Sequence, residues 1–268
     1  PYTTLFRSAS ATVAGMTTGD FDLYSFDESQ ADEWRNYEAT AFNLVPGKGY
    51  LYAKKATTEN QTYTFQLTGI PYNNEPITLS KSESGDFPGW NLVGNPFGET
   101  AVLSDNRDFY VMNPDGNDIV TPERNYIEPM EGAFVYAEQN GDELTFYKTE
   151  SSTGNKGALS INVVKASNHR GNRLIDRAVV RFGEGNVLPK FMLNENHTKV
   201  YMPVDGNDYA VVYTENQGEQ PVSFKAEENG TYTLSFNTED IELGYLHLID
   251  NLAGKDIDLL STPSYSFE

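Results

Sequence analysis

The chain has 268 residues, with 39 acidic and 19 basic side chains and a formal net charge of −20. A field of this sign repels phosphate backbones and anionic lipid, so nucleic acid and bare membrane are poor candidate partners. Because there is no cysteine, disulfides, thiolate zinc sites and thiol nucleophiles are excluded, and the length predicts two domains.

The first eight residues are set aside from the fold prediction. They read Pro-Tyr-Thr-Thr-Leu-Phe-Arg-Ser, which a common sequencing-adapter string encodes in one reading frame. We expect residues 1–8 to be an assembly artefact, and the chain to be a metagenomic fragment whose export signal was not read. At the other end, residues 264–268 stop in mid-alternation, as a cut strand would.

Alternation of apolar and polar side chains, rich in tyrosine and phenylalanine, predicts strands throughout. In the first half they cover 49–53, 62–67, 90–93, 108–112, 132–137 and 144–147. In the second half they cover 158–165, 174–182, 199–202, 209–213, 221–226, 231–236 and 245–250. No apolar run approaches the roughly 18 residues of a membrane helix, so direct membrane insertion is not expected.

One segment has the pattern of a short helix. Ser29 can cap it, and Ala31, Trp34 and Tyr37 fall on one stripe at helical spacing. The sequence therefore predicts a few helical turns between two strands.

Two stretches between residues 21 and 148 resemble each other. Trp34-Arg35-Asn36-Tyr37 and Val45-Pro46-Gly47 in the first match Glu123-Arg124-Asn125-Tyr126 and Glu128-Pro129-Met130 in the second. The matched positions 24/110, 46/129, 52/136 and 65/146 lie 81 to 86 residues apart. A competing match, of residues 42–45 with 90–93, is shorter. We therefore predict an internal duplication in the longer register.

The domain boundary is predicted in a polar segment without apolar anchors. Residues 151–157 read Ser-Ser-Thr-Gly-Asn-Lys-Gly and form the predicted linker. A duplicated β-domain would precede it at 9–150, and a β-sandwich truncated at its C-terminus would follow at 158–268. The predicted fold class is all-β, with two antiparallel β-sandwich-like domains in series.

The tetrapeptide Asp-Gly-Asn-Asp occurs twice, at 115–118 and 205–208. Its oxygen-rich side chains could coordinate a hard cation such as Ca²⁺. Asp-Gly between strands is also the strongest short hairpin signal, because glycine takes positive φ without steric cost. We favour the turn interpretation, and the presence of calcium stays open.

The two tryptophans could be stacking platforms for a sugar, since an aromatic face buries a large area against a flat ligand. Trp90, however, shares a strand face with Leu92, and Trp34 shares the predicted helical stripe. Both patterns favour positions in a core.

Scarce positive charges gather in one stretch of the second half. They are Lys165, His169, Arg170, Arg173, Arg177 and Arg181. Three of the arginines share strand parity and could present a basic ridge to an anionic glycan or a protein. We favour the alternative, a solvated strand face paired with the acidic surface.

The three histidines, His169, His197 and His247, have no metal-ligand spacing and no neighbouring nucleophile motif. With so many carboxylates, acid pairs carry no argument for glycosidase chemistry. The sequence identifies no catalytic, cofactor-binding or metal-binding residue, and we predict no cofactor and no enzyme.

Two stretches of the first half carry a family resemblance. Gly89-Trp90-Asn91-Leu92-Val93-Gly94-Asn95-Pro96-Phe97 and Ile127-Glu128-Pro129-Met130-Glu131-Gly132-Ala133-Phe134-Val135 resemble a module of large secreted surface proteins of Bacteroidota. In the second half, residues 176–182, 245–251 and 262–267 look like the β-sandwich that precedes a type IX secretion sorting domain. The resemblance implies an extracellular or cell-surface location.

The function expected on this basis is a non-enzymatic structural and interaction region of an adhesin-like protein, which spaces upstream modules from a C-terminal export signal. The alternative is a carbohydrate-binding module of a secreted glycan-degrading or adhesive protein. A surface glycan or a protein is the expected partner, and the oligomeric state is left open.

Overall fold

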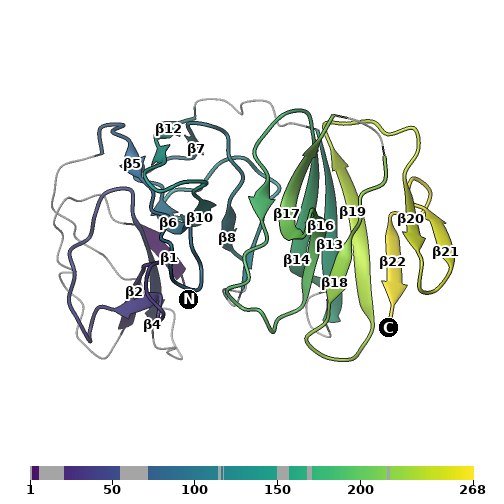
Figure 1. The fold of residues 1–268 in the computed structure, drawn as a ribbon, viewed down its shortest axis with the longest axis horizontal. Helices are drawn as coiled ribbons and strands as arrows, with labels where there is room; N and C mark the ends of the chain where they lie inside the picture. Colours follow the sequence, from purple (N-terminus) through teal and green to yellow (C-terminus); the bar gives the residue numbers. More distant parts are fainter. Residues whose placement is uncertain are drawn as a thin grey trace. The chain divides into compact units, whose positions relative to one another are not determined.

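The computed structural model describes residues 2–5, 21–54, 72–113, 116, 118–149, 157–167, 171–215 and 218–268. Every regular element in these ranges is a β-strand (Figure 1), so the chain is all-β as the alternating pattern predicts. It divides into two compact units, Pro1–Ser152 and Thr153–Glu268, at the segment predicted as a linker. The described residues contain no helix long and apolar enough to cross a membrane.

The first unit contains two four-stranded antiparallel sheets and two antiparallel strand pairs. The strand orders are β1-β4-β2-β3 and β6-β10-β8-β9, and the pairs are β11-β5 and β12-β7. The strands are β1 (Tyr2–Leu5), β2 (Phe21–Phe26), β3 (Trp34–Asn36), β4 (Gly49–Lys54), β5 (Ile77–Thr78), β6 (Trp90–Gly94), β7 (Ala101–Leu103), β8 (Tyr110–Met112), β9 (Ile119–Val120), β10 (Gly132–Tyr136), β11 (Glu143–Leu144) and β12 (Phe146–Lys148).

Both four-stranded sheets follow the same path. In each, the last strand in the sequence lies between the first and the second, and the third pairs outside the second. The β1 strand of the first sheet lies in the segment set aside as an artefact, and Tyr2 pairs there with Tyr52. Strand 62–67 of the predicted repeat lies outside the described residues.

Matched turns precede the central strands β4 and β10. Val45 O accepts a hydrogen bond from Lys48 N, and Glu128 O accepts one from Glu131 N. The third turn residue has positive φ in both, 77° at Gly47 and 64° at Met130. Type II turns require this, and proline is common at their second position. The register differs by one residue, because Tyr24 pairs with Leu51 but Tyr110 pairs with Phe134. The duplication stays a prediction.

The helix predicted around Ser29 is wrong. Residues 27–33 instead form the turn of a β2-β3 hairpin, in which Phe26 pairs with Trp34 and Asp27 N donates to Glu33 O. The Asp27 carboxylate accepts hydrogen bonds from the amide and hydroxyl of Ser29. Because strand pairing on both sides fixes Phe26 beside Trp34, residues 27–33 must reverse the chain within seven residues and cannot continue as a helix through Trp34.

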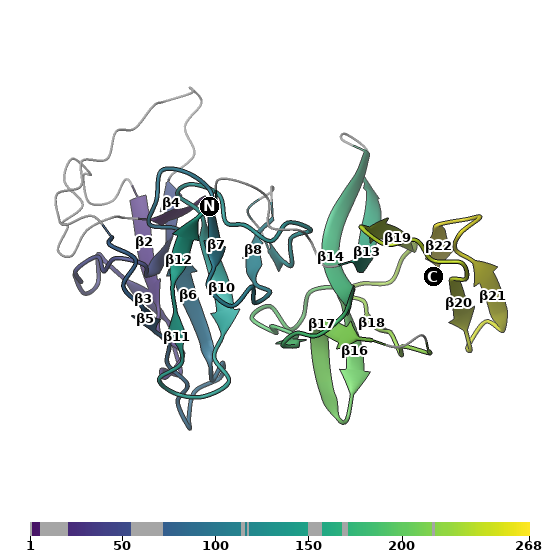
Figure 2. The ribbon, with the colours of Figure 1, turned by 90° about the horizontal axis from the view of Figure 1, so that it is seen from above.

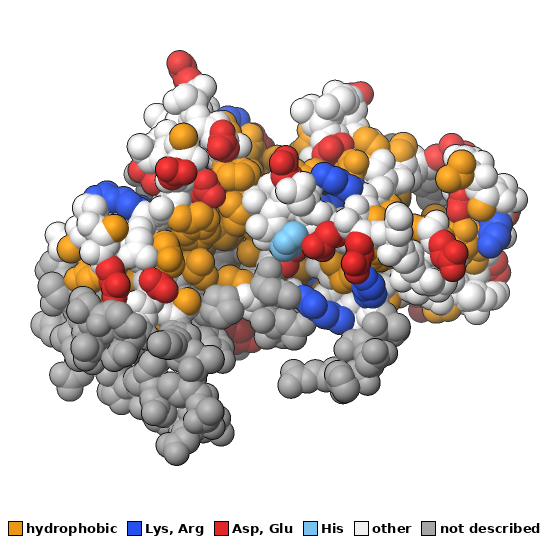
Figure 3. Space-filling model, turned by 90° about the horizontal axis from the view of Figure 1, so that it is seen from below, with side chains coloured by type: hydrophobic (Ala, Val, Ile, Leu, Met, Phe, Trp, Pro, Cys, Tyr) orange, Lys and Arg blue, Asp and Glu red, His pale blue; other side chains and the backbone are white. Residues whose placement is uncertain are grey.

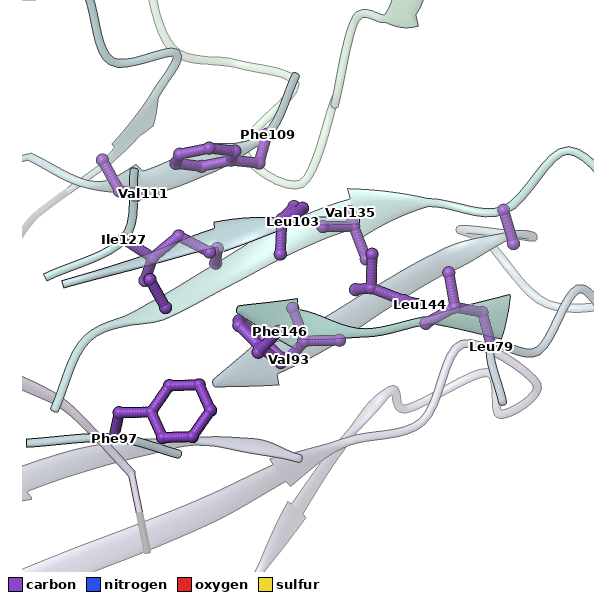
Figure 4. Packing of buried hydrophobic residues seen from close by; sticks show 13 residues of the cluster. Leu79, Val93, Phe97, Leu103, Phe109, Val111, Ile127, Val135, Leu144 and Phe146 are labelled. Carbon is purple, nitrogen blue, oxygen red and sulfur yellow. The ribbon is translucent and has the colours of Figure 1, made fainter. Parts of the chain in front are cut away.

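Strand β10 has both faces covered. Ala133 and Val135 point into the main core of the unit, shown in Figure 4, where side chains from β6, β7, β8, β11 and β12 meet. Phe134 and Tyr136, at alternate positions, face the opposite side of the sheet. Leu144 and Phe146, on β11 and β12, are fully buried in the main core.

A smaller core lies under the first sheet. It contains Phe21, Leu23, Leu44, Tyr50 and Tyr52. Gly49 marks where this sheet meets the second: an added Cβ there would lie 2.5 Å from the backbone oxygen of Val93, closer than packed atoms allow. The adjacent Lys48 forms a bridge with the same residue.

The second unit is built on one eight-stranded sheet, with the order β18-β16-β17-β14-β13-β19-β22 and β15 paired to β17. Its strands, seen from two directions in Figures 1 and 2, are β13 (Ala158–Ser167), β14 (Gly171–Phe182), β15 (Leu188–Pro189), β16 (Lys199–Val204), β17 (Asn207–Thr214), β18 (Ser223–Lys225), β19 (Tyr232–Glu239) and β22 (Ser264–Phe267). The strands β20 (His247–Asp250) and β21 (Lys255–Asp258) form a separate hairpin.

This sheet curls around a core and is therefore sandwich-like. The ring centroids of Phe224 and Phe267 are 4.9 Å apart, although their strands, β18 and β22, lie at opposite ends of the strand order. One pair departs from the predicted antiparallel pattern, since β14 and β17 run parallel with Val179 opposite Val211. Parallel neighbours need a long crossover, and residues 183–206 supply it.

Buried tyrosine predicts a loss of stability at high pH. Burial raises the pKa of Tyr50 to about 12 against the opposing hydrogen bond from Val45 N. In the unfolded chain the phenol loses its proton near pH 10, so between these pH values the unfolded state binds fewer protons than the fold. We expect the free energy of unfolding to fall by about 2–3 kcal/mol across this window.

Urea unfolding followed by tryptophan fluorescence measures this effect, because both tryptophans lie in the first unit. Tyr50→Phe should flatten the alkaline slope, whereas Tyr147→Phe, at a half-exposed ring, should not. An unchanged slope in Tyr50→Phe would exclude this phenol as the cause.

Candidate functional site

An aromatic layer covers the second face of the β6-β10-β8-β9 sheet. Trp90 packs edge-on against Tyr110 at 5.6 Å and Tyr136 at 5.4 Å between ring centroids. Phe134, in the same layer, packs edge-on against Phe26 at 5.1 Å and Trp34 at 6.1 Å. Edge-to-face contacts of this kind stabilise aromatic pairs beyond their buried area.

The two tryptophans differ in access to solvent. Trp90 is 5% exposed, as predicted for a core position, so its ring faces are not available to a ligand. Trp34 is half-buried and packs edge-on against Phe26 and Tyr24. The core position predicted for Trp34 is therefore only partly correct, and of the two tryptophans only Trp34 can reach a flat ligand.

The asparagines of the Asn-Leu-Val-Gly-Asn-Pro segment tie loops to this sheet. Buried Asn95 donates to the carbonyls of Glu99, Ile127 and Glu128 at 2.8–3.0 Å and accepts a hydrogen bond from Phe97 N. Asn91 likewise accepts from Ser80 N and donates to Ser80 O. Their hydrogen-bonding capacity serves the fold, because an unpaired buried amide would cost stability.

Glu28 is a buried carboxylate that the sequence did not mark. It is 2% exposed and accepts hydrogen bonds from the amide and hydroxyl of Ser82, the latter at 2.6 Å, and from Gly89 N. These hydrogen bonds join the β2-β3 turn to the loop before β6. Gly85 approaches the Glu28 carbonyl so closely that a Cβ would lie 2.1 Å from it.

Lys48 is a half-buried amine between the two sheets of the first unit. Burial lowers its pKa, although nearby Asp27 raises it. A perturbed lysine in a cleft can be a nucleophile. Here the cause is desolvation where β4 meets β6, and the bridge to Val93 gives the residue a structural role.

Only the second of the two Asp-Gly-Asn-Asp segments is fully described, and it lies at a hairpin turn. At the second, Val204 pairs with Asn207 and leaves Asp205 and Gly206 as a two-residue loop with φ of 49° and 83°, as the turn interpretation predicts. Of the first segment, Asp115 and Asn117 lie outside the described residues, and Asp118 N donates to Asn113 Oδ1. The described residues contain no group of three metal-ligating side chains.

The basic ridge considered as an alternative for β14 does not form, and the solvated face that we favoured is wrong for two of the three arginines. Val163 pairs with Asp176 but Val164 pairs with Leu174, so a bulge inserts one residue between Arg173 and Arg177. Because one extra residue reverses the facing of all that follow, Arg173 lies on the other face and is exposed.

Beyond the bulge the arginines are buried. Arg177 and Arg181 are 8% and 7% exposed, and Arg177 Nε donates to Asn162 Oδ1 at 2.6 Å. Lys165 fits the predicted pairing with surface acids, since its hydrogen bond to Glu228 raises its pKa. His169 and Arg170 lie outside the described residues.

A buried ion pair lies on the core side of β14. Lys190 Nζ lies 2.6 and 2.8 Å from the two carboxylate oxygens of Asp176, and both side chains are 1% exposed. Val200 N also donates to this carboxylate. The pair ties β14 to β16 and to the crossover after β15. Two features of the sequence could have indicated this ion pair: an acid inside an apolar strand, and a lysine directly after Leu188-Pro189.

The other two histidines lie apart. His197 is half-buried, and its amide donates to Asn194 O. His247 contacts Asp256, with 2.6 Å between Nδ1 and Oδ1. On the face shown in Figure 3, acidic side chains are spread over both units.

No family model, no curated protein and no solved structure matches the chain.

The ion pair predicts a specific pattern of mutant stabilities. Asp176→Asn or Lys190→Met alone should lower the free energy of unfolding of the second unit by about 3–5 kcal/mol, because each leaves a buried charge unpaired. The double variant should lose less than either single variant, since no charge remains and the introduced amide oxygen can still accept a hydrogen bond from Val200 N.

Urea unfolding followed by the amide cross-peak of Val200 reports this unit directly. Lys225→Met, at an exposed position, is the matched control and should change stability by less than about 0.5 kcal/mol. Additive losses in the double variant would mean that the two side chains act separately.

Proposed function

We propose that the chain is a non-enzymatic structural and interaction region of a secreted, adhesin-like cell-surface protein, which spaces upstream modules from a C-terminal export signal. The observation that carries this proposal is how the fold uses its buried polar groups. In the described ranges, every buried side-chain nitrogen and oxygen has a hydrogen-bond partner.

The strongest polar constellations illustrate the point. Glu28 closes a turn onto a loop, Asn95 holds two loops against a sheet, and Asp176 joins strands through Lys190. A catalytic site holds polar groups ready for a substrate, whereas these groups are occupied by the chain itself. Such groups favour rigid structural units over a reaction centre.

The cell-surface part of the proposal is supported by the resemblance of residues 89–97, 127–135 and 245–251 to Bacteroidota type IX cargo. The physical properties are compatible with it, because both units have their own hydrophobic cores without cysteine. A strongly acidic surface also suits a soluble exported region.

The alternative, a carbohydrate-binding module, is favoured by one observation. Trp34 and Tyr24 are half-buried members of the aromatic layer, and partly exposed aromatic rings can stack on a sugar.

A spacer must stay folded under tension, and the two units should do so separately. Pulling the chain between marker domains in single-molecule force spectroscopy should give two unfolding events. At about 3.6 Å per extended residue, units 1–152 and 153–268 release at most about 550 Å and about 420 Å. A single event, or a unit that extends without resistance, would contradict the spacer role.

Affinity electrophoresis in polysaccharide gels decides the alternative. The spacer proposal expects no retardation. Retardation that Trp34→Ala removes, in protein still folded by circular dichroism, would favour carbohydrate binding. Tyr147→Ala, at an exposed ring outside the aromatic layer, is the matched control and should leave any retardation intact.

A further inference from the structure

The β20-β21 hairpin stands apart from the eight-stranded sheet of its unit, beside β22 in Figure 2. Its base is fixed by Leu259, which is 4% exposed and whose amide donates to Leu246 O. An isolated hairpin has little stability of its own, so one face must pack against the unit.

That packed face can be assigned. Asp250 pairs with Lys255, and both side chains contact Tyr265 of β22: the phenol donates to Asp250 Oδ2 at 2.6 Å, and Lys255 Nζ lies 5.4 Å from the ring centroid. Leu248 and its partner Ile257 point to this same face, because each lies two residues from Asp250 or Lys255 on its strand.

The outward face carries the remaining residues. His247 pairs with Asp258, and Ile249 pairs with Asp256. Tyr245 lies just before β20, and its ring stacks on His247 with 4.3 Å between the ring centroids. An aromatic and apolar row therefore lies beside two carboxylates.

The outward face and the turns next to it expose several apolar side chains. Tyr245 is 72% exposed and Ile249 is 53% exposed, while Leu252 in the turn is fully exposed and Leu260 is half-exposed. Single exposed apolar residues need no explanation, but several gathered together mark an interaction site.

The outer edge of β21 pairs with no described strand, since only β20 pairs with it. One of its backbone groups is occupied, because Asp258 O accepts a hydrogen bond from Thr262 N. An edge strand with unpaired backbone groups is a template for another strand, and peptide recognition often uses such an edge.

Charge selects the occupant. Residues 239–268 contain seven acids and one lysine, so a second copy of this chain would be repelled, whereas a cationic segment would be attracted. Asp256 and Asp258 are two residues apart, which spaces them by about 6.6–6.8 Å along the strand. Basic residues at alternate positions of an extended partner have the same spacing.

We propose that the outward face and open edge of the β20-β21 hairpin bind an extended basic segment of a partner protein, added to β21 as a third strand. Its lysines or arginines lie directly opposite Asp256 and Asp258. Cβ atoms of residues opposite each other on paired strands are about 4.5–5.5 Å apart. The exposed Tyr245 ring offers a further cation contact. This inference adds a partner to the interaction role and requires neither export nor a spacer function.

Peptide titrations of the full chain test the proposal. The probe is a nine-residue peptide that alternates lysine and threonine; the controls are a peptide with glutamate for lysine and one of equal composition with its lysines in a block. We expect the alternating peptide to shift the amide cross-peaks of residues 255–258, and to bind at least five-fold more tightly than the block peptide. Equal binding of both, or shifts spread over the acidic surface, would overturn the proposal.

Two further comparisons separate the face from the edge. Asp256→Asn with Asp258→Asn should weaken binding at least five-fold, whereas Asp205→Asn with Asp208→Asn, the same charge change on the β16-β17 hairpin, should weaken it less than two-fold. A peptide N-methylated on the amides that would face β21 should bind at least ten-fold more weakly, which tests strand addition without altering the protein. Equal losses in both double variants, or no loss on methylation, would refute binding at this edge.

Discussion

The architecture of the first unit depends on burying both faces of strand β10 at once. Ala133 and Val135 enter the main core on one side, while Phe134 and Tyr136 join the aromatic layer on the other. A strand covered on both faces needs neighbours on both edges and layers on both sides. The pairing of β6 and β8 with β10, and the packing of Phe26 and Trp34 over it, follow from this requirement.

In the second unit, a buried ion pair between Asp176 and Lys190 constrains the path of the chain. Asp176 lies on the core side of β14 beside Ala178, where an unpaired carboxylate would be very costly. Lys190 reaches it from the crossover that the parallel pairing of β14 with β17 makes necessary. A buried pair of this kind adds little net stability, but it penalises any arrangement that separates the two residues. It therefore favours one path of the crossover over others.

Local patterns predicted much of this fold. Period-two alternation correctly predicted strands at β4, β6, β10, β13 and β17. Because Trp90 and Leu92 point to the same face of one strand, the sequence also correctly predicted that Trp90 is buried. The repeated Asp-Gly signal at 205–206 predicted a hairpin because turn geometry is a local property.

The predictions were wrong where a contact distant in sequence, or a single inserted residue, determines the local structure. Spacing alone favoured a helix near Trp34, but pairing with Phe26 and the Asp27 turn prevailed. Parity placed three arginines on one face, and a bulge invisible in the pattern reversed one of them. The partners of Glu28 and Asp176 come from distant segments, so no spacing rule could join them.

The long β13 strand has a consequence for how the second unit is made. One of its edges pairs with β14, the next strand in the chain, but the other pairs with β19, so that Val164 meets Thr233. Contacts so distant in sequence slow folding. A nascent chain that ends before β19 presents a bare apolar ribbon, prone to associate with other unfinished chains. Both edges of β13 are paired, and the strand is protected from aggregation, only once β19 has been synthesised.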